Sequence, residues 1–107
     1  MSGELNLDPA IFSPDQDGLQ DGLVIAYSFN GPGAVGTMTI HDLAGRKIRT
    51  LLDNELLGTE GAVSWDGISD TNEKARIGAY VVLFEVFDLN GETETFQETI
   101  TLAHYLD

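Results

Sequence analysis

Hydrophobic and polar residues alternate with a period of two along most of this chain. Such alternation is typical of β-strands that bury one face, because successive side chains of a strand point to opposite sides. Seven such runs are separated by segments rich in Gly, Asn, Asp or Pro, and they span residues 8–12, 23–29, 35–42, 46–52, 62–65, 77–88 and 93–102. No run keeps the period of a helix, and only residues 53–58 are expected to hold a helical turn. The pattern therefore predicts an all-β chain.

The apolar positions of each run indicate which side chains face the core. They are Leu23, Ile25, Tyr27 and Phe29 in the second run, Met38 and Ile40 in the third, Val63 and Trp65 in the fifth, and Phe96, Ile100 and Leu102 in the last. The run at 77–88 is the longest apolar alternation, which predicts a central strand.

Two connections between the runs carry a clear signal. Asn90-Gly91 lies between the last two runs, and both residue types tolerate the positive φ that a type I′ turn requires. We therefore expect a two-residue hairpin that pairs the last two strands antiparallel. Residues 66–76 are polar and are expected to form a long loop.

Seven short strands without a helix, in 107 residues, are typical of an immunoglobulin-like or fibronectin III-like antiparallel β-sandwich, with a barrel as the alternative. The length suits one domain with one core. We assign residues 8–107 to this domain and interpret residues 1–7 as an expression remnant or a linker.

Charge and composition narrow the classes of partner. The chain has 18 acidic and 5 basic residues and a formal net charge of -13, which disfavours nucleic acid and anionic lipid as partners. It contains no cysteine and no apolar run long enough to predict membrane insertion. No signal-peptide pattern opens the sequence, so export would depend on a signal upstream of these residues.

An acidic segment between the first two runs is the candidate metal site. Asp15, Asp17 and Asp21 surround a glycine that allows a sharp bend, and calcium favours such carboxylate oxygens. The carbonyl of Leu19 is a further candidate ligand. A calcium ion needs six to eight oxygens, and the candidates from other loops are Asp8, Asp66 and Asp70. The alternative is that these aspartates only form Asx turns in a solvated loop.

The sequence offers little support for catalysis. His41 and His104 lie on different predicted strands without zinc-ligand spacing, and we interpret both as surface strand residues. No serine lies in a nucleophile elbow, and a pair of carboxylates suited to glycoside hydrolysis would need a cleft that so small a sandwich hardly provides. Trp65 could stack on a sugar, but its alternation with Val63 favours a core position. We therefore predict no catalytic residue, and no cofactor other than calcium.

Several motifs together resemble a known group of domains. They are FSPDQDGLQD at 12–21, IHDLAGR at 40–46, IRTL at 48–51, WDG at 65–67 and GAY at 78–80. In order and spacing they resemble the C-terminal Ig-like domains of Bacteroidetes secreted and surface proteins. These domains are similar to the Ig-like domain of the flagellar hook-capping protein and to type IX secretion C-terminal domains, and they often follow lamin-tail domains.

This resemblance implies a β-sandwich within an exported, multidomain protein. Asp15, Asp17 and Asp21 match the family's acidic element associated with calcium. Positions that look structural in the family are matched by Trp65, Gly67, Gly78 and Tyr80. The last run departs from type IX sorting domains, because residues 98–104 contain none of the lysines that usually occur in their final strand.

We therefore expect a non-catalytic module that acts in sorting, surface attachment or spacing of an extracellular or cell-surface protein. Its expected partners are the upstream domains of that protein and an outer-membrane export or attachment machine. The alternative is an adhesin-like or carbohydrate-binding sandwich appended to an enzyme, which would need exposed aromatic rings.

Overall fold

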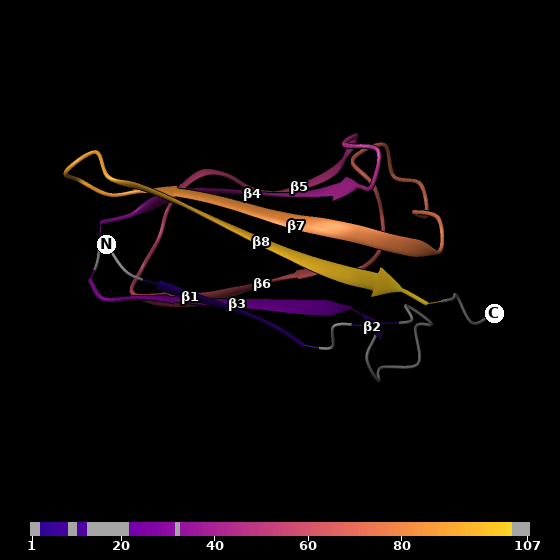
Figure 1. Cartoon of the computed structure of the whole chain (residues 1–107), viewed down its shortest axis with the longest axis horizontal. Coiled ribbons are helices and arrows are strands. Elements are labelled where there is room, and N and C mark those ends of the chain that lie inside the picture. The colour runs from indigo at the N-terminus through magenta and orange to yellow at the C-terminus, as the bar shows by residue number, and fades with distance from the viewer. Residues whose placement is uncertain (1–2, 9–10, 13–21, 32, 104–107) are drawn as a thin grey trace.

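The computed structural model describes residues 3–8, 11–12, 22–31 and 33–103. Among these residues the chain forms strands and no helix (Figure 1). The strands are β1 (Gly3–Asp8), β2 (Ile11–Phe12), β3 (Leu23–Phe29), β4 (Val35–Asp42), β5 (Lys47–Leu56), β6 (Glu60–Trp65), β7 (Gly78–Phe87) and β8 (Thr93–Leu102). No membrane-spanning helix is therefore present in the described part of the chain.

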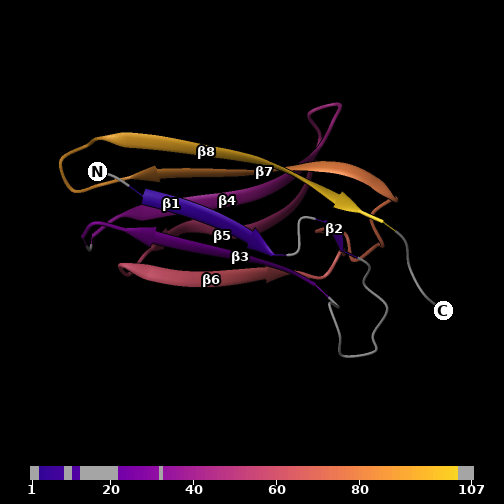
Figure 2. The same ribbon diagram turned by 60° about the horizontal axis from the view of Figure 1, so that its bottom comes forward.

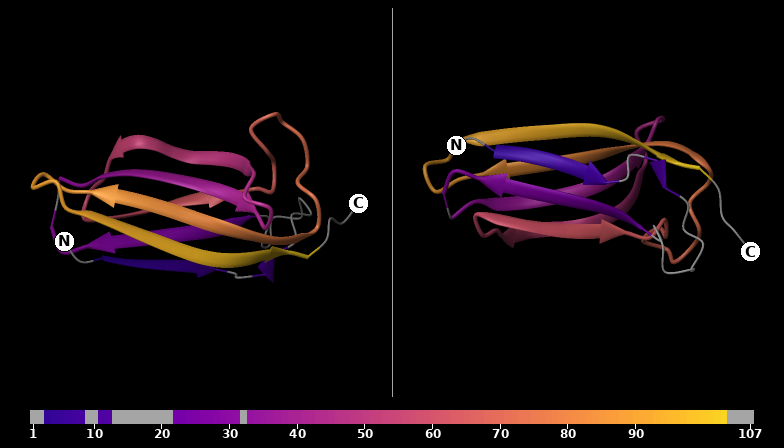
Figure 3. Two further views of the ribbon diagram at one scale, coloured as in Figure 1. Left: turned by 45° about the horizontal axis from the view of Figure 1, so that its top comes forward. Right: turned by 90° about the horizontal axis from the view of Figure 1, so that it is seen from below.

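The strands form two sheets that face each other. One sheet has the order β1-β3-β6, and the other has the order β2-β8-β7-β4-β5. Figures 2 and 3 show the two layers stacked, with the three-stranded sheet on one side. Seven strands pair antiparallel, and the two-residue β2 pairs parallel with the end of β8. The predicted immunoglobulin-like antiparallel β-sandwich is confirmed, and β7 lies in the interior of its sheet as expected.

Apolar side chains from both sheets fill the space between them. The buried residues are Leu23, Ile25, Phe29, Ala34, Met38, Ile40, Leu57, Trp65, Ala75, Tyr80, Val82, Phe84, Val86, Ile100 and Leu102. No charged or polar residue of the described chain is buried, although Glu94 is half-buried with one carboxylate oxygen out of solvent. The inward faces predicted for the strands are confirmed, with Tyr27, Val63 and Phe96 half-buried against this core.

The beginning of the chain differs from the prediction. Gly3–Asp8 is a strand that pairs with residues 24–29 of β3, so these residues are part of the sandwich and the linker interpretation is wrong for them. Leu5 and Leu7 pack against the core, which stabilises this edge strand. The single strand expected at 8–12 is also wrong, because Asp8 ends β1 in one sheet and Ile11–Phe12 joins the other sheet.

The helical turn expected at residues 53–58 is absent. β5 continues to Leu56, and its register against β4 shifts between Met38 and Gly36. Asn54 takes a positive φ of 50° at this bulge, and the Thr37 hydroxyl accepts a hydrogen bond from its backbone amide at 3.1 Å. Asparagine tolerates this conformation better than most residues, so the extra residue is absorbed within an edge strand.

Candidate functional site

The predicted calcium ligands Asp15, Asp17, Leu19 and Asp21 lie outside the described residues. The structure does describe Gly22, which follows them directly. A β-carbon on Gly22 would lie 2.9 Å from the backbone oxygen of Trp65 and 3.9 Å from the Cα of Asp66. Of the three aspartates predicted to assist, Asp66 is thus in direct proximity to the end of the acidic segment.

The three assisting aspartates have different surroundings. Asp66 accepts a hydrogen bond from the amide of Ile68 at 3.0 Å, and Asp70 accepts one from the amide of Thr50 at 3.1 Å. Asp8 is exposed at the end of β1. Within the described residues no three acidic or histidine side chains converge as a metal site would require. These aspartates are therefore not brought together with one another.

Of the two histidines, His104 lies outside the described residues. His41 lies on the outer face of β4, where its Nε2 is 2.9 Å from the Thr39 hydroxyl and its Nδ1 is 3.4 Å from the Gly45 carbonyl oxygen. Both ring nitrogens thus have protein partners. His41 is a half-buried surface strand residue, as predicted.

Trp65 belongs to the core and not to a sugar-binding surface. It is 1% exposed, and its ring meets that of Tyr80 edge-on at a centroid distance of 5.4 Å. Its indole nitrogen donates to the Ile68 carbonyl at 2.9 Å, and the Tyr80 hydroxyl donates to the Arg76 carbonyl. Burial raises the pKa of the Tyr80 hydroxyl, and the nearby Asp42 charge adds to this effect. The indole nitrogen and the hydroxyl thus both fix the loop between β6 and β7.

One five-residue turn occurs three times in the described chain, at residues 42–46, 69–73 and 88–92. In each copy the first residue's amide donates to the fifth residue's carbonyl and its carbonyl accepts from the fourth residue's amide, at 2.8–3.1 Å. The fourth residue has a positive φ, which is 87° at Gly45, 81° at Gly91 and 66° at Asn72. The β7–β8 hairpin is therefore present as predicted, but its type I′ turn is wrong, because Asn90 does not have a positive φ.

Acidic or hydroxyl side chains at the first position stabilise these turns. The Asp42 carboxylate accepts from the amides of Ala44 and Arg46, both at 2.9 Å, and the Asp88 carboxylate accepts from the equivalent amides of its own loop. The hydroxyl of Ser69 accepts from the amide of Glu73 at 3.2 Å. These side chains satisfy backbone amides that would otherwise have no partner in the loop.

Asp42 also forms an ion pair with the side chain of Arg46. The Arg46 Nε lies 3.0 Å from its Oδ2. The hydrogen bond from the Arg46 amide, together with this side chain, lowers the pKa of Asp42 below its usual value. This carboxylate is therefore ionised for a structural reason.

A basic depression next to the 42–46 turn was not predicted from the sequence. It has a volume of about 550 Å³ and lies between the 42–46 turn, the start of β5 and the loop that precedes β7. Its lining includes the carboxylates of Asp42, Asp70 and Glu73 and the basic side chains of Arg46, Lys47, Lys74 and Arg76. These are four of the five basic residues of the chain, and the fifth, Arg49, is adjacent and donates to the Ile68 carbonyl at 3.2 Å.

The sequence did contain a signal for this depression. Its basic residues occur only at 46–49 and 74–76, in a chain that is otherwise acidic. The topology brings the two segments together, because β4 and β7 are antiparallel neighbours and Asp42 pairs with Tyr80. Alternation within single strands carries no information about this convergence.

Comparison with solved structures confirms the fold. The chain is similar to CopC from Methylosinus trichosporium OB3b, with a TM-score of 0.57 and 17% sequence identity over 96% of this chain and 95% of that one. At this identity the similarity shows a shared β-sandwich and no more. No family model matches the sequence, and no curated protein matches it either.

Proposed function

We propose that this domain is a non-catalytic Ig-like module of an exported multidomain bacterial protein, acting in sorting, surface attachment or spacing. The observation that carries the proposal is that the polar side chains suited to catalysis are already hydrogen-bonded within the fold. Those that could perform chemistry, such as Asp42, Asp88 and the Tyr80 hydroxyl, are hydrogen-bonded to loop backbone. The interior of the sandwich is packed with apolar side chains, which suits a rigid module.

A transfer experiment tests the role in sorting or attachment. The 107-residue chain is fused behind a fluorescent reporter that carries a signal peptide, and the fusion is expressed in a Bacteroidetes host. Protease accessibility on intact cells then measures how much reporter reaches the surface. The proposal expects surface or medium localisation, whereas a fusion with an unrelated β-sandwich of equal size remains periplasmic. Equal retention of both fusions contradicts sorting and attachment and leaves spacing as the role.

We further propose that calcium stabilises the module through Asp15, Asp17, Asp21 and the carbonyl of Leu19. The observation that supports this proposal is the close approach of Gly22 to the Trp65-Asp66 backbone, which favours Asp66 as an assisting ligand. Carboxylates held close together repel one another, and a bound cation removes this repulsion. The role of the ion is thus to fix a loop.

The alternative of a carbohydrate-binding sandwich receives less support from the described surface. A shallow depression on the outer face of the larger sheet is lined by His41, Asp42, Leu43, Gly45, Val81, Leu83 and Gln97. None of these residues offers the flat aromatic ring of Trp, Tyr or Phe on which sugars stack, and Trp65 is buried.

A further inference from the structure

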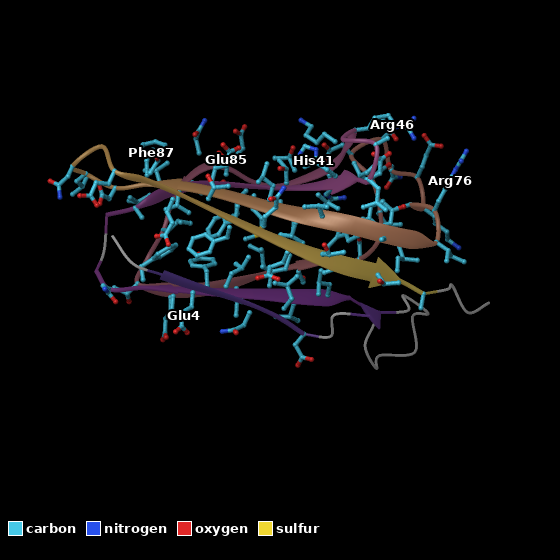
Figure 4. All side chains as sticks on the ribbon, in the orientation of Figure 1. Glu4, His41, Arg46, Arg76, Glu85 and Phe87 are labelled. Carbon is cyan, nitrogen blue, oxygen red and sulfur yellow. The ribbon has the colours of Figure 1, made fainter. Side chains whose placement is uncertain are left out.

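The two ends of the sandwich differ in charge. All five basic residues of the chain lie at the end formed by the 42–46 turn and the loop before β7, which we call the basic pole. Figure 4 shows Arg46 and Arg76 at this end and Glu4 and Phe87 toward the other. The long axis of the molecule is 47 Å, so the two ends are separated by several Debye lengths at physiological salt.

At the opposite end, which we call the acidic pole, the charged side chains of the described residues are all carboxylates. Strand register places them there, because the end of β3, the start of β4 and the β7–β8 hairpin share this end. The acidic residues of this pole are Glu4, Glu55, Glu60, Asp88, Glu92 and Glu94. Its most protruding part is the turn at 88–92, which we call the tip, and its Leu89 is 84% exposed.

Exposed apolar side chains follow the same division. Of the six large hydrophobic residues that are exposed in the described chain, Leu43 and Ile77 lie at the basic pole, and Leu56, Phe87 and Leu89 lie at the acidic pole. Leu43 and Ile77 both line the basic depression. The acidic pole therefore combines negative charge with apolar surface, and the depression at the basic pole combines apolar surface with four basic and three acidic side chains. Apolar surface next to charge is the composition of a protein interface.

Two cations of the basic pole are paired within it, because Arg46 lies 3.0 Å from Asp42 and Arg49 lies 3.8 Å from Asp70. The carboxylates Asp42, Asp66 and Asp70 also accept hydrogen bonds from backbone amides, and Glu73 accepts one from the Thr71 hydroxyl. Lys47 and Arg76 are exposed and form no ion pair with another described residue. The depression thus offers the cations of Lys47 and Arg76, beside the exposed apolar side chains of Leu43 and Ile77, to a partner that enters it.

We propose that the domain associates end to end with further copies of itself, the tip of one copy entering the basic depression of the next. The tip supplies Leu89 to the apolar floor and Glu92 to the cations around it. The depression, at about 550 Å³, is large enough for a turn of this size. The two surfaces differ, so the contact is heterologous and can repeat along a row of molecules. The proposal concerns the domain in solution and does not depend on its role in export.

The contact is expected to be weak and dependent on salt. An end of 28 by 20 Å is smaller than the roughly 800 Å² that each partner buries in a standard interface. The net charge of -13 makes copies repel each other at very low salt, whereas about 0.1 M salt screens this repulsion and leaves contacts within roughly 10 Å effective. We expect a dissociation constant on the order of 0.1 to 1 mM, weakening at about 1 M salt.

Sedimentation velocity of the purified chain over a concentration series tests the proposal. One double variant, Lys47→Gln with Arg76→Gln, changes the depression, and another, Leu89→Ser with Glu92→Gln, changes the tip. Each is expected to lower the association constant at least about tenfold at 0.1 M salt. A matched control, Val24→Ser with Glu98→Gln, removes an exposed apolar residue and a carboxylate away from tip and depression and leaves association unchanged.

Mixing the two variants gives the decisive result. The depression variant retains an intact tip and the tip variant retains an intact depression, so the mixture should form dimers and stop there. Circular dichroism on each variant verifies that it is folded. A wild-type chain that stays monomeric up to about 1 mM, or a mixture that regains no dimer, overturns the proposal.

Discussion

Trp65 and Tyr80 meet edge-on, with ring planes at 72°, and each donates a hydrogen bond into the loop that connects their strands. Trp65 ends β6 in one sheet and Tyr80 lies near the start of β7 in the other. Their contact therefore holds the two sheets together at the base of a long crossover. The hydroxyl of Tyr80 bonding four residues back is the arrangement known as the tyrosine corner in Ig-like sandwiches.

Removing the Tyr80 hydroxyl tests the importance of this corner. Tyr80→Phe leaves the Arg76 carbonyl without its partner and should lower the free energy of unfolding by about 1 to 2 kcal/mol. The corresponding fall in melting temperature is roughly 5 to 10 °C. Tyr27→Phe is the matched control, since the Tyr27 hydroxyl has no hydrogen bond among the described residues. Thermal unfolding that is equal for the two variants would contradict a structural role for the corner.

The turn at 69–73 predicts an unusual response to substitution at Asn72. Its φ of 66° is the conformation that glycine takes in the other two copies of the turn. Asn72→Ala should cost about 1 kcal/mol, because an alanine β-carbon is strained there, whereas Asn72→Gly should be neutral or slightly stabilising. Urea unfolding of both variants checks this. An alanine variant as stable as the glycine variant would contradict the assigned turn.

Asp42 should make the stability of the domain decrease as the pH is lowered into the acidic range. Its pKa is lowered in the folded state by the Arg46 amide hydrogen bond and side chain. The stabilisation is present above the unfolded-state value of about 4 and is lost as the pH falls through the lower folded-state value. Asp42→Asn should flatten the acid limb of a plot of melting temperature against pH. Asp53→Asn, at an exposed aspartate, serves as control, and an equal effect of both substitutions would reject the assignment.

Calcium should stabilise the protein through the acidic segment and Asp66. Addition of calcium to chelator-treated protein, at about 100 times its dissociation constant, should add about 2.7 kcal/mol to the free energy of unfolding. Asp17→Ala should abolish the increment and Asp66→Asn should reduce it. Asp70→Asn should leave it unchanged, because Asp70 bonds to β5 in the other sheet. Calorimetry measures the increment, and its absence from the unmutated protein rejects the site.

Much of the fold followed from alternation within single strands. Leu23, Ile25, Met38, Ile40 and Trp65 are all buried, because a period of two in a strand places alternate side chains on one face. Leu5 and Leu7 show the same alternation, and their strand was missed only because the chain start was interpreted as a linker.

Features that depend on contacts between segments could not be predicted in this way. The bulge at Asn54 arises from pairing with Thr37, 17 residues earlier in the chain. Likewise, the convergence of Arg46 with Arg76 depends on the register of β4 against β7. Sequence order alone gives none of these distances.

We propose that the domain positions a larger protein and performs no chemistry of its own. The direct test compares the full-length parent protein with a version that lacks this domain and a version in which an unrelated β-sandwich replaces it. We expect kcat and KM of the purified parent to stay the same in all three, while its amount at the cell surface falls on deletion. Loss of kcat on deletion, with the remaining domains folded, would contradict a role restricted to positioning.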